Sequence, residues 1–211
     1  MALAKTRLSG AQYVARGYAQ VEPNHLSARR NGQIYAQLPA NADIAVLENG
    51  QFVKYDYAAH EVNFTGKGAW MLVFNEIKVY RDFQGDADFA MIKDNYEYSV
   101  FDALGSANYT HLYGESETAG HTAGLARSGE KMVPRVFKIS VGDIYTTNAI
   151  NEQVSDIAVG DILTVGAGGW LIKAGDSSTD VSKLNGPVFQ VAQVYVMPDL
   201  QPGVKLQCIA E

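Results

Sequence analysis

The chain of 211 residues contains one cysteine, Cys208. A single cysteine excludes an intramolecular disulfide and any metal site built from several thiolates. Cys208 lies in a segment in which apolar and polar residues alternate, close to Val204 and Leu206. We therefore expect a buried thiol with a packing role.

Long apolar runs are also absent. No segment approaches the roughly 20 apolar residues that a transmembrane helix requires, and we expect no membrane partner. The hydrophobic content of 47% is nevertheless ordinary for a globular protein. The length suits one large all-β domain or two smaller ones.

Basic residues are outnumbered, with 17 Lys and Arg against 23 Asp and Glu. Residues 1–42 nevertheless carry +4, which leaves −10 for the rest of a chain whose total charge is −6. A basic segment on an acidic body can bind nucleic acid or a neighbouring acidic subunit. Nucleic acid requires a dense cationic patch, and the longest basic run here is Arg29-Arg30. We therefore expect contacts with other subunits.

Glycine and proline predict that residues 1–42 form an extended arm. Gly10, Gly17 and Gly32 interrupt any helix, and Pro23 and Pro39 favour extended backbone before them. The cations and aromatic residues of this arm are the predicted capsid or subunit contacts: Arg7, Arg16, Tyr18, Arg29, Arg30 and Tyr35.

Two stretches begin with the same four residues, Asp-Ile-Ala-Val, at Asp43 and at Asp156. The first continues through Asn49-Gly50 and the second through Gly166–Gly169, and each is followed by a strand-like segment. Asn-Gly and Gly-Gly between alternating runs are strong hairpin signals. Val141-Gly142-Asp143-Ile144 is repeated as Val159-Gly160-Asp161-Ile162. These repeats predict hairpins that present surfaces.

The predicted fold is mainly β, with one or two small antiparallel β-barrel or sandwich units, the extended arm and at most one or two short helices. Residues 43–104 form a first β region, in which 86–104 are expected to be irregular with some helix. Residues 105–132 form a Gly-, Ser-, Thr- and His-rich loop, and 133–211 a second β region.

Three stretches resemble catalytic or nucleotide-binding motifs, and each fails on a required position. Gly114–Thr118 lacks the final glycine of a nucleophile elbow. Gly124–Lys131 places Glu130 inside a would-be phosphate loop. Gly166–Gly169 lacks the third glycine of a dinucleotide fingerprint and precedes a strand pattern, so it predicts a turn. We expect no catalytic residues, no cofactor and no small-molecule substrate.

The histidines do not match a metal-binding template. His111 and His121 flank Glu115 and Glu117, but their spacings fit neither a zinc nor a calcium motif. Asp176 and Asp180 lie in a polar turn without the residues of an EF-hand loop. We therefore expect no metal site.

Four segments of the chain resemble structural proteins of tailed bacteriophages. They are Leu47–Tyr55, Leu72–Tyr80, Pro134–Lys138 and Val141–Asn148. The resemblance implies a head auxiliary, decoration or cement protein without catalytic residues. Its partners would be the major capsid protein and copies of itself, with a trimer as the expected oligomer. It would lie on the capsid surface of the virion, and in the host cytoplasm during assembly.

Two other interpretations remain open at this stage. The chain could be another virion component, such as a tail or head–tail connector protein. It could also be a carbohydrate-binding β module or a sugar-active enzyme that uses Trp70, Trp170 and the His-containing loop.

Overall fold

The computed structural model describes residues 19–75, 90–92, 132–197 and 201–211. The fold is mainly β, with two antiparallel sheets of six and five strands that do not close into a barrel. The described part contains one α-helix, the short α1 (Ser27–Asn31). The predicted β-rich class is confirmed. None of the described helices is long and apolar enough to cross a membrane.

The six-stranded sheet has the order β1-β9-β13-β12-β10-β11. Its long central hairpin pairs β12 with β13, and the β-branched and aromatic content of β12 favours a strand there. Its strands are β1 (Val21–His25), β9 (Ile144–Thr147), β10 (Ile162–Val165), β11 (Leu171–Gly175), β12 (Val188–Val196) and β13 (Pro202–Ala210). Short 3₁₀ turns lie between them at η2 (Val154–Asp156), η3 (Ala167–Gly169) and η4 (Val181–Lys183).

The five-stranded sheet has the order β2-β8-β6-β4-β5. Its strands are β2 (Ile34–Tyr35), β4 (Phe52–Asp56), β5 (Glu61–Asn63), β6 (Ala69–Val73) and β8 (Val136–Phe137). A separate two-stranded ribbon pairs β3 (Val46–Glu48) with β7 (Ala90–Ile92). Met71, Leu72 and Val73 of β6 are all buried, so this strand is covered on both faces, as its apolar run predicts.

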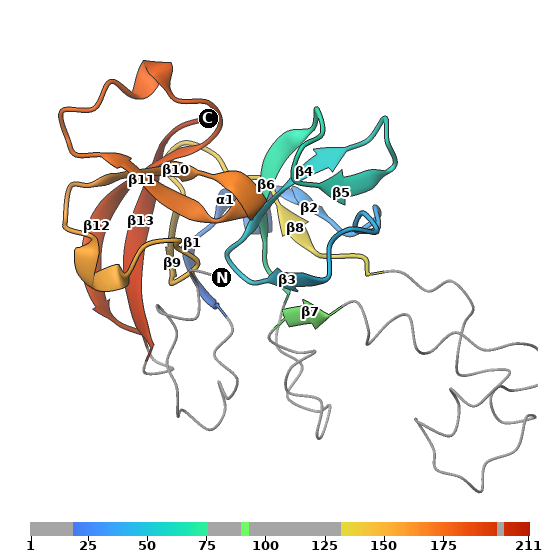
Figure 1. The fold of residues 1–211 in the computed structure, drawn as a ribbon, viewed down its shortest axis with the longest axis horizontal. Coiled ribbons are helices and arrows are strands. Elements are labelled where there is room, and N and C mark those ends of the chain that lie inside the picture. Colours follow the sequence, from blue (N-terminus) through green and yellow to red (C-terminus); the bar gives the residue numbers. More distant parts are fainter. Residues whose placement is uncertain (1–18, 76–89, 93–131, 198–200) are drawn as a thin grey trace, which may run out of the picture.

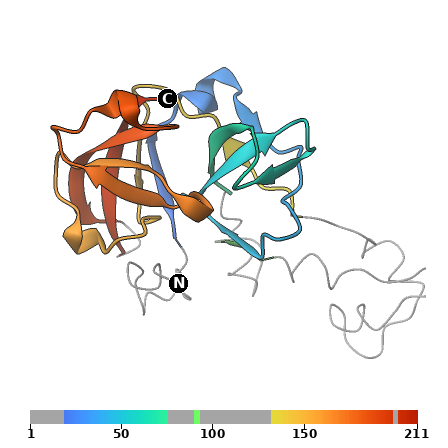
Figure 2. The same ribbon diagram turned by 45° about the horizontal axis from the view of Figure 1, so that its top comes forward.

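The two sheets lie side by side as two lobes, visible in Figure 1 and again after the rotation in Figure 2. One apolar core joins them: Phe52 of β4 contacts Phe189 of β12 at a ring-centroid distance of 5.6 Å. Tyr145 meets Phe189 edge to face at 5.5 Å. Edge-to-face and tilted contacts of this kind are favoured by the aromatic quadrupole. A second core cluster lies under the five-stranded sheet.

Residues 19–42, which the sequence analysis assigned to the extended arm, contribute to both sheets. β1 pairs with β9, and β2 pairs with β8. Ala19, Leu26 and Ala28 are buried, and Leu26 and Ala28 belong to the apolar core that joins the lobes. The arm boundary expected at residue 42 therefore differs from the structure, and residues 1–18 lie outside the described part.

The two predicted hairpins have different outcomes. The Gly166–Gly169 turn joins β10 to β11, which pair antiparallel as expected. At Asn49-Gly50 the turn is present, but the prediction of a hairpin is wrong: β3 pairs with β7, and β4 pairs with β5 and β6. Gly50 has a φ of +91° and lies so close to Thr147 and Ala149 that a Cβ atom would overlap both side chains.

The repeated Val-Gly-Asp-Ile sequences form the same structure twice. In each turn the glycine has a φ above +90°, and the aspartate side chain accepts the N–H of the residue three positions earlier, Ser140 or Ala158. Both turns dock on the central hairpin, since Gly142 N–H donates to the Cys208 carbonyl and Gly160 N–H to the Val191 carbonyl. The six-stranded sheet thus has an approximate internal two-fold arrangement around β12 and β13.

The Gly166–Gly169 turn also connects the lobes. Gly169 has a φ of +75°, and a Cβ atom there would overlap the Phe52 carbonyl oxygen of β4. The Gln51 side-chain amide donates to the Gly168 carbonyl at 3.0 Å. Gly169, in a segment that superficially resembles a nucleotide-binding motif, is therefore required by its close approach to the β4 backbone.

Several predictions fall on residues outside the described part. These include the loop 105–131, its histidines and the rejected motifs at Gly114–Thr118 and Gly124–Lys131. Of the segment 86–104, in which some helix was expected, residues 90–92 are described and form strand β7. Cys208 is 1% exposed, and burial raises the pKa of its thiol to about 12. The expectation of a buried thiol is confirmed.

Candidate functional site

The candidate site is an open pocket of about 340 Å³ between the two lobes. This volume lies at the small end of the range typical of ligand-binding pockets, roughly 300–1,000 Å³. The five-stranded sheet supplies Lys54, Gly68, Ala69 and Trp70, and the chain after β8 supplies Lys138 and Ile139. Gly186 and Pro187, just before β12, and Glu211, just after β13, come from the six-stranded lobe.

Trp70 is held at the edge of the pocket by its strand and by two glycines. Gly68 lies against the backbone of Tyr55 and Asp56, where a Cβ atom would not fit, so β6 starts close to β4. On the opposite lobe, Gly186 lies beside the indole, and a Cβ atom there would approach the ring to 2.8 Å. The indole is half-buried, with its inner part packed on the shared core.

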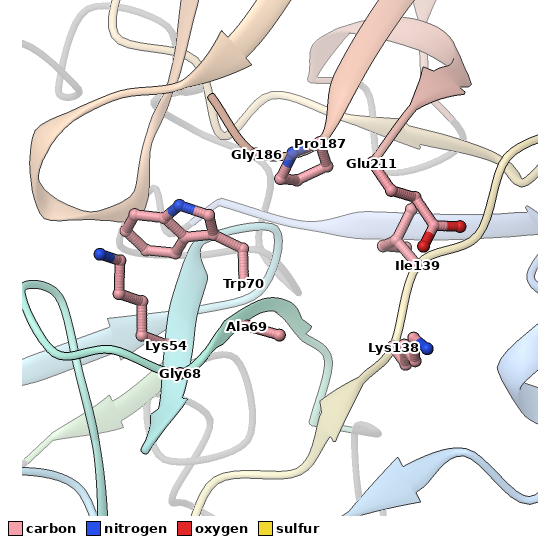
Figure 3. Close-up of a pocket in the computed structure, with 9 residues that line it drawn as sticks. All are labelled: Lys54, Gly68, Ala69, Trp70, Lys138, Ile139, Gly186, Pro187 and Glu211. Atoms are coloured by element: carbon pink, nitrogen blue, oxygen red, sulfur yellow. The ribbon is translucent and has the colours of Figure 1, made fainter. Parts of the chain in front are cut away.

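Lys54 is the register partner of Trp70 on the neighbouring strand β4. Directly opposed residues of an antiparallel pair point to the same face of a sheet. The Lys54 Nζ atom lies 5.1 Å from the centre of the Trp70 ring, a cation–π distance. Figure 3 shows this pair on one side of the pocket.

Glu211, Ile139 and Lys138 form the opposite side of the pocket (Figure 3). Ile139 is buried and is the residue just before the first repeated turn. The Glu211 carboxylate accepts the N–H of Val141, in that turn, at 3.0 Å. The turn therefore fixes both the apolar wall of the pocket and the position of its acidic rim.

The pocket combines apolar surface with charged groups of both signs. Lys54 and Lys138 form no ion pair with any residue in the described ranges. The lining includes no serine, threonine, cysteine or histidine, and Glu211 is its one carboxylate. Nucleophilic and general acid–base catalysis both need paired groups within hydrogen-bond reach. The described lining holds no such pair.

Of the residues predicted as contacts from sequence, the described ones, Arg29, Arg30 and Tyr35, do not line this pocket. Arg29 and Arg30 are exposed in the last turn of α1. Tyr35 is half-buried on β2, where its ring lies 5.1 Å from that of Tyr55. Arg7, Arg16 and Tyr18 lie outside the described part.

The residues that line the pocket are harder to identify from the sequence than the predicted contact residues. The sequence indicates Trp70 as a carbohydrate-binding residue in one interpretation, but no pattern in it indicates Lys54, Lys138 or Glu211. They are separated by up to 157 positions in the chain. Lys54 and Trp70 are neighbours because of the strand register between β4 and β6. This register is set by the folded sheet and is not visible as a local sequence motif.

Over the ranges that the structure describes, no group of three or more His, Cys, Asp or Glu side chains is arranged to hold a metal ion. Asp176 and Asp180 instead accept hydrogen bonds from Ser178 and Ser182. These hydrogen bonds lower the pKa values of both carboxyl groups.

Comparison with known proteins gives no identification. No protein-family model, no curated protein and no solved structure matches the chain.

Proposed function

We propose that this chain is a non-enzymatic structural protein of a tailed-bacteriophage head that binds and stabilises the capsid lattice. The observation that carries the proposal is the pocket between the lobes, which has a half-buried tryptophan and two lysines without ion pairs among the described residues, and whose described lining holds no pair of catalytic groups. Tryptophan is enriched among the residues that dominate binding energy at interfaces. The resemblance of four segments to phage structural proteins supplies the virion setting.

The N-terminal residues add a second contact. Residues 1–18 carry Lys5, Arg7 and Arg16 and no acidic residue. Ala19, which follows them, is held in the fold by its N–H, which donates to the Glu48 carboxylate at 2.7 Å. A basic segment attached at such a fixed point suits the acidic surface of a neighbouring subunit. We propose that the protein forms homo-oligomers, with a trimer around the local axes of the capsid.

The test uses expanded heads assembled from the major capsid protein of the same phage without auxiliary proteins. Purified protein is added at increasing concentration, and the bound fraction is measured after sedimentation of the heads. We expect binding that saturates at a fixed ratio to capsid subunits and an increase in the temperature at which the heads break open. Binding that never saturates, or none, would contradict the proposal.

A further inference from the structure

We infer that Asn185 is a site of spontaneous deamidation, at which the chain acquires a carboxylate next to the pocket between the lobes. The chain contains three Asn-Gly pairs, Asn31-Gly32, Asn49-Gly50 and Asn185-Gly186. Glycine after asparagine favours the reaction, because it has no side chain to hinder ring closure and is conformationally permissive. The structure distinguishes the three pairs, and the inference does not rest on the proposed function.

The reaction needs only the two residues and water. The Gly186 amide nitrogen loses its proton and attacks the Cγ atom of the Asn185 side chain. A bond forms between this nitrogen and Cγ, the bond from Cγ to the side-chain nitrogen breaks, and ammonia leaves with the proton. Water then opens the cyclic imide at either carbonyl and gives aspartate or isoaspartate. The glycine N–H must therefore be free of a competing hydrogen bond, and the asparagine side chain must be free to turn.

Asn49-Gly50 fails both conditions. Asn49 is fully buried, its side-chain oxygen accepts the Asn75 N–H at 2.7 Å, and its amide donates to the Asn75 carbonyl at 3.2 Å. The Gly50 N–H donates to the Val73 carbonyl at 2.9 Å. These buried hydrogen bonds must break before the ring can close. We therefore expect Asn49 to be protected.

Asn31-Gly32 fails one condition. Asn31 is the last residue of α1 and is exposed, so its side chain is free to turn. Gly32 caps the helix, however, and its N–H donates to the Ala28 carbonyl. The attacking nitrogen is thus held at the helix end. This pair separates the effect of the glycine hydrogen bond from the effect of exposure.

Asn185-Gly186 meets both conditions. Asn185 is exposed and lies between η4 and β12, outside the helices and strands. Neither its side chain nor the Gly186 N–H has a hydrogen-bond partner among the described residues. The nitrogen and the Cγ atom can therefore approach each other without loss of a native hydrogen bond.

Gly186 couples this reaction to the pocket. Gly186 and Trp70 both line it (Figure 3), and a Cβ atom on Gly186 would approach the indole to 2.8 Å. Isoaspartate at position 185 adds a methylene group to the backbone, and a negative charge, directly before this tightly packed glycine. We expect the indole of Trp70 to shift as the product forms.

The experiment follows the three pairs in one molecule. Purified protein is kept in mildly alkaline buffer, and samples are digested at low pH, where no further deamidation occurs. Mass spectrometry measures the deamidated fraction at each asparagine, and enzymatic methylation detects isoaspartate. Protein unfolded in urea gives the rates without the fold. Asn185→Gln is the matched control, because glutamine would have to form a larger ring. Tryptophan fluorescence is recorded in parallel.

We expect Asn185 to deamidate about five-fold faster than Asn31 in the folded protein, the factor for opening one backbone hydrogen bond. Asn49 should not react detectably. The three rates should become similar in urea. Tryptophan fluorescence of the wild type should change at the rate of deamidation, and that of Asn185→Gln should stay constant.

An Asn185 that reacts no faster than Asn31 or Asn49 in the folded protein would overturn the inference. The same order of rates in urea would show that local sequence, and not the fold, selects the site. Deamidation at Asn185 with unchanged fluorescence would overturn the coupling to the pocket. None of these measurements involves heads, so the proposed function is tested separately.

Discussion

The hydroxyl of Tyr195 donates a hydrogen bond of 2.6 Å to the carboxylate of Glu22, although the two residues are 173 positions apart. The same hydroxyl lies 2.8 Å from the Thr146 hydroxyl, and Lys205 lies over the Tyr195 ring at 5.3 Å. Tyr195 is on β12 and Glu22 on the edge strand β1, with β13 and β9 between them. The contact ties the N-terminal strand to the central hairpin.

Tyr195→Phe should therefore destabilise the protein. Removing the hydroxyl deletes a hydrogen bond to a charged acceptor, and such bonds contribute about 1.5–3 kcal/mol. Urea unfolding followed by circular dichroism measures the loss. Tyr57→Phe is the matched control, because Tyr57 is 68% exposed. Equal unfolding free energies for the two variants would show that the contact does not hold β1.

Tyr145→Phe should have the opposite effect. The Tyr145 hydroxyl is fully buried and has no hydrogen-bond partner among the described residues. Burial also raises the pKa of this phenol well above its usual value. A buried polar group without a partner costs about 1–3 kcal/mol, so its removal should leave stability unchanged or increase it. A clear decrease in unfolding free energy would contradict the described environment.

Two glycine substitutions separate backbone strain from steric overlap. Gly160 and Gly169 both have positive φ, but a Cβ atom at Gly160 meets nothing within 4 Å, whereas at Gly169 it overlaps the Phe52 carbonyl. Gly160→Ala should lower the free energy of unfolding by about 1–2 kcal/mol, because the alanine must adopt a left-handed backbone conformation. Gly169→Ala should cost more and disturb the contact between the lobes. Similar decreases in the thermal unfolding temperature of the two variants would indicate that the turn does not pack tightly against β4.

The ion pair between Asp161 and Lys173 predicts a pH dependence. Burial alone would raise the pKa of Asp161, but the hydrogen bond and charge of Lys173, together with the Ala158 N–H, lower it overall. A lowered carboxyl pKa stabilises the fold above the usual value near 4, and this stabilisation is lost as the pH falls through the lowered pKa.

Lys173→Gln leaves Asp161 buried but removes the positive charge that lowers its pKa. Acid unfolding of this variant should therefore begin at a higher pH. The measurement is ellipticity between about pH 2 and 6, the region in which carboxyl groups titrate. Lys183→Gln is the control, because its partner Asp180 is half exposed and such surface pairs contribute little. An acid transition that moves equally in both variants would refute this assignment.

The sequence predicts turns, strand segments and the burial of single side chains better than it predicts which strands pair with each other. The Gly166–Gly169 hairpin, the β12 and β13 strands and the buried thiol of Cys208 follow from turn residues and alternation. The pairing of β3 with β7 could not be predicted from the sequence, because Asn49-Gly50 specifies a turn but not which strand lies beside β3. Gly50 instead packs on Thr147 and Ala149, about a hundred positions further along the chain.

The pocket was predictable only in part. Trp70 is conspicuous as one of two tryptophans, but nothing near it in the sequence indicates Glu211 or Lys138. These residues meet because the first repeated turn binds Glu211 and positions Ile139. Equally, residues 19–42 contain glycine, proline and arginine typical of an arm, yet the buried Ala19, Leu26 and Ala28 place them within the fold.

The central claim is that this protein works by adhesion to a capsid lattice, and the mass of single particles tests it most directly. Heads lacking auxiliary proteins are weighed by charge-detection mass spectrometry before and after incubation with excess protein. We predict a discrete increase to a plateau equal to a fixed number of copies per capsid subunit. Heads whose mass is unchanged, or increases continuously without a plateau, would contradict the claim.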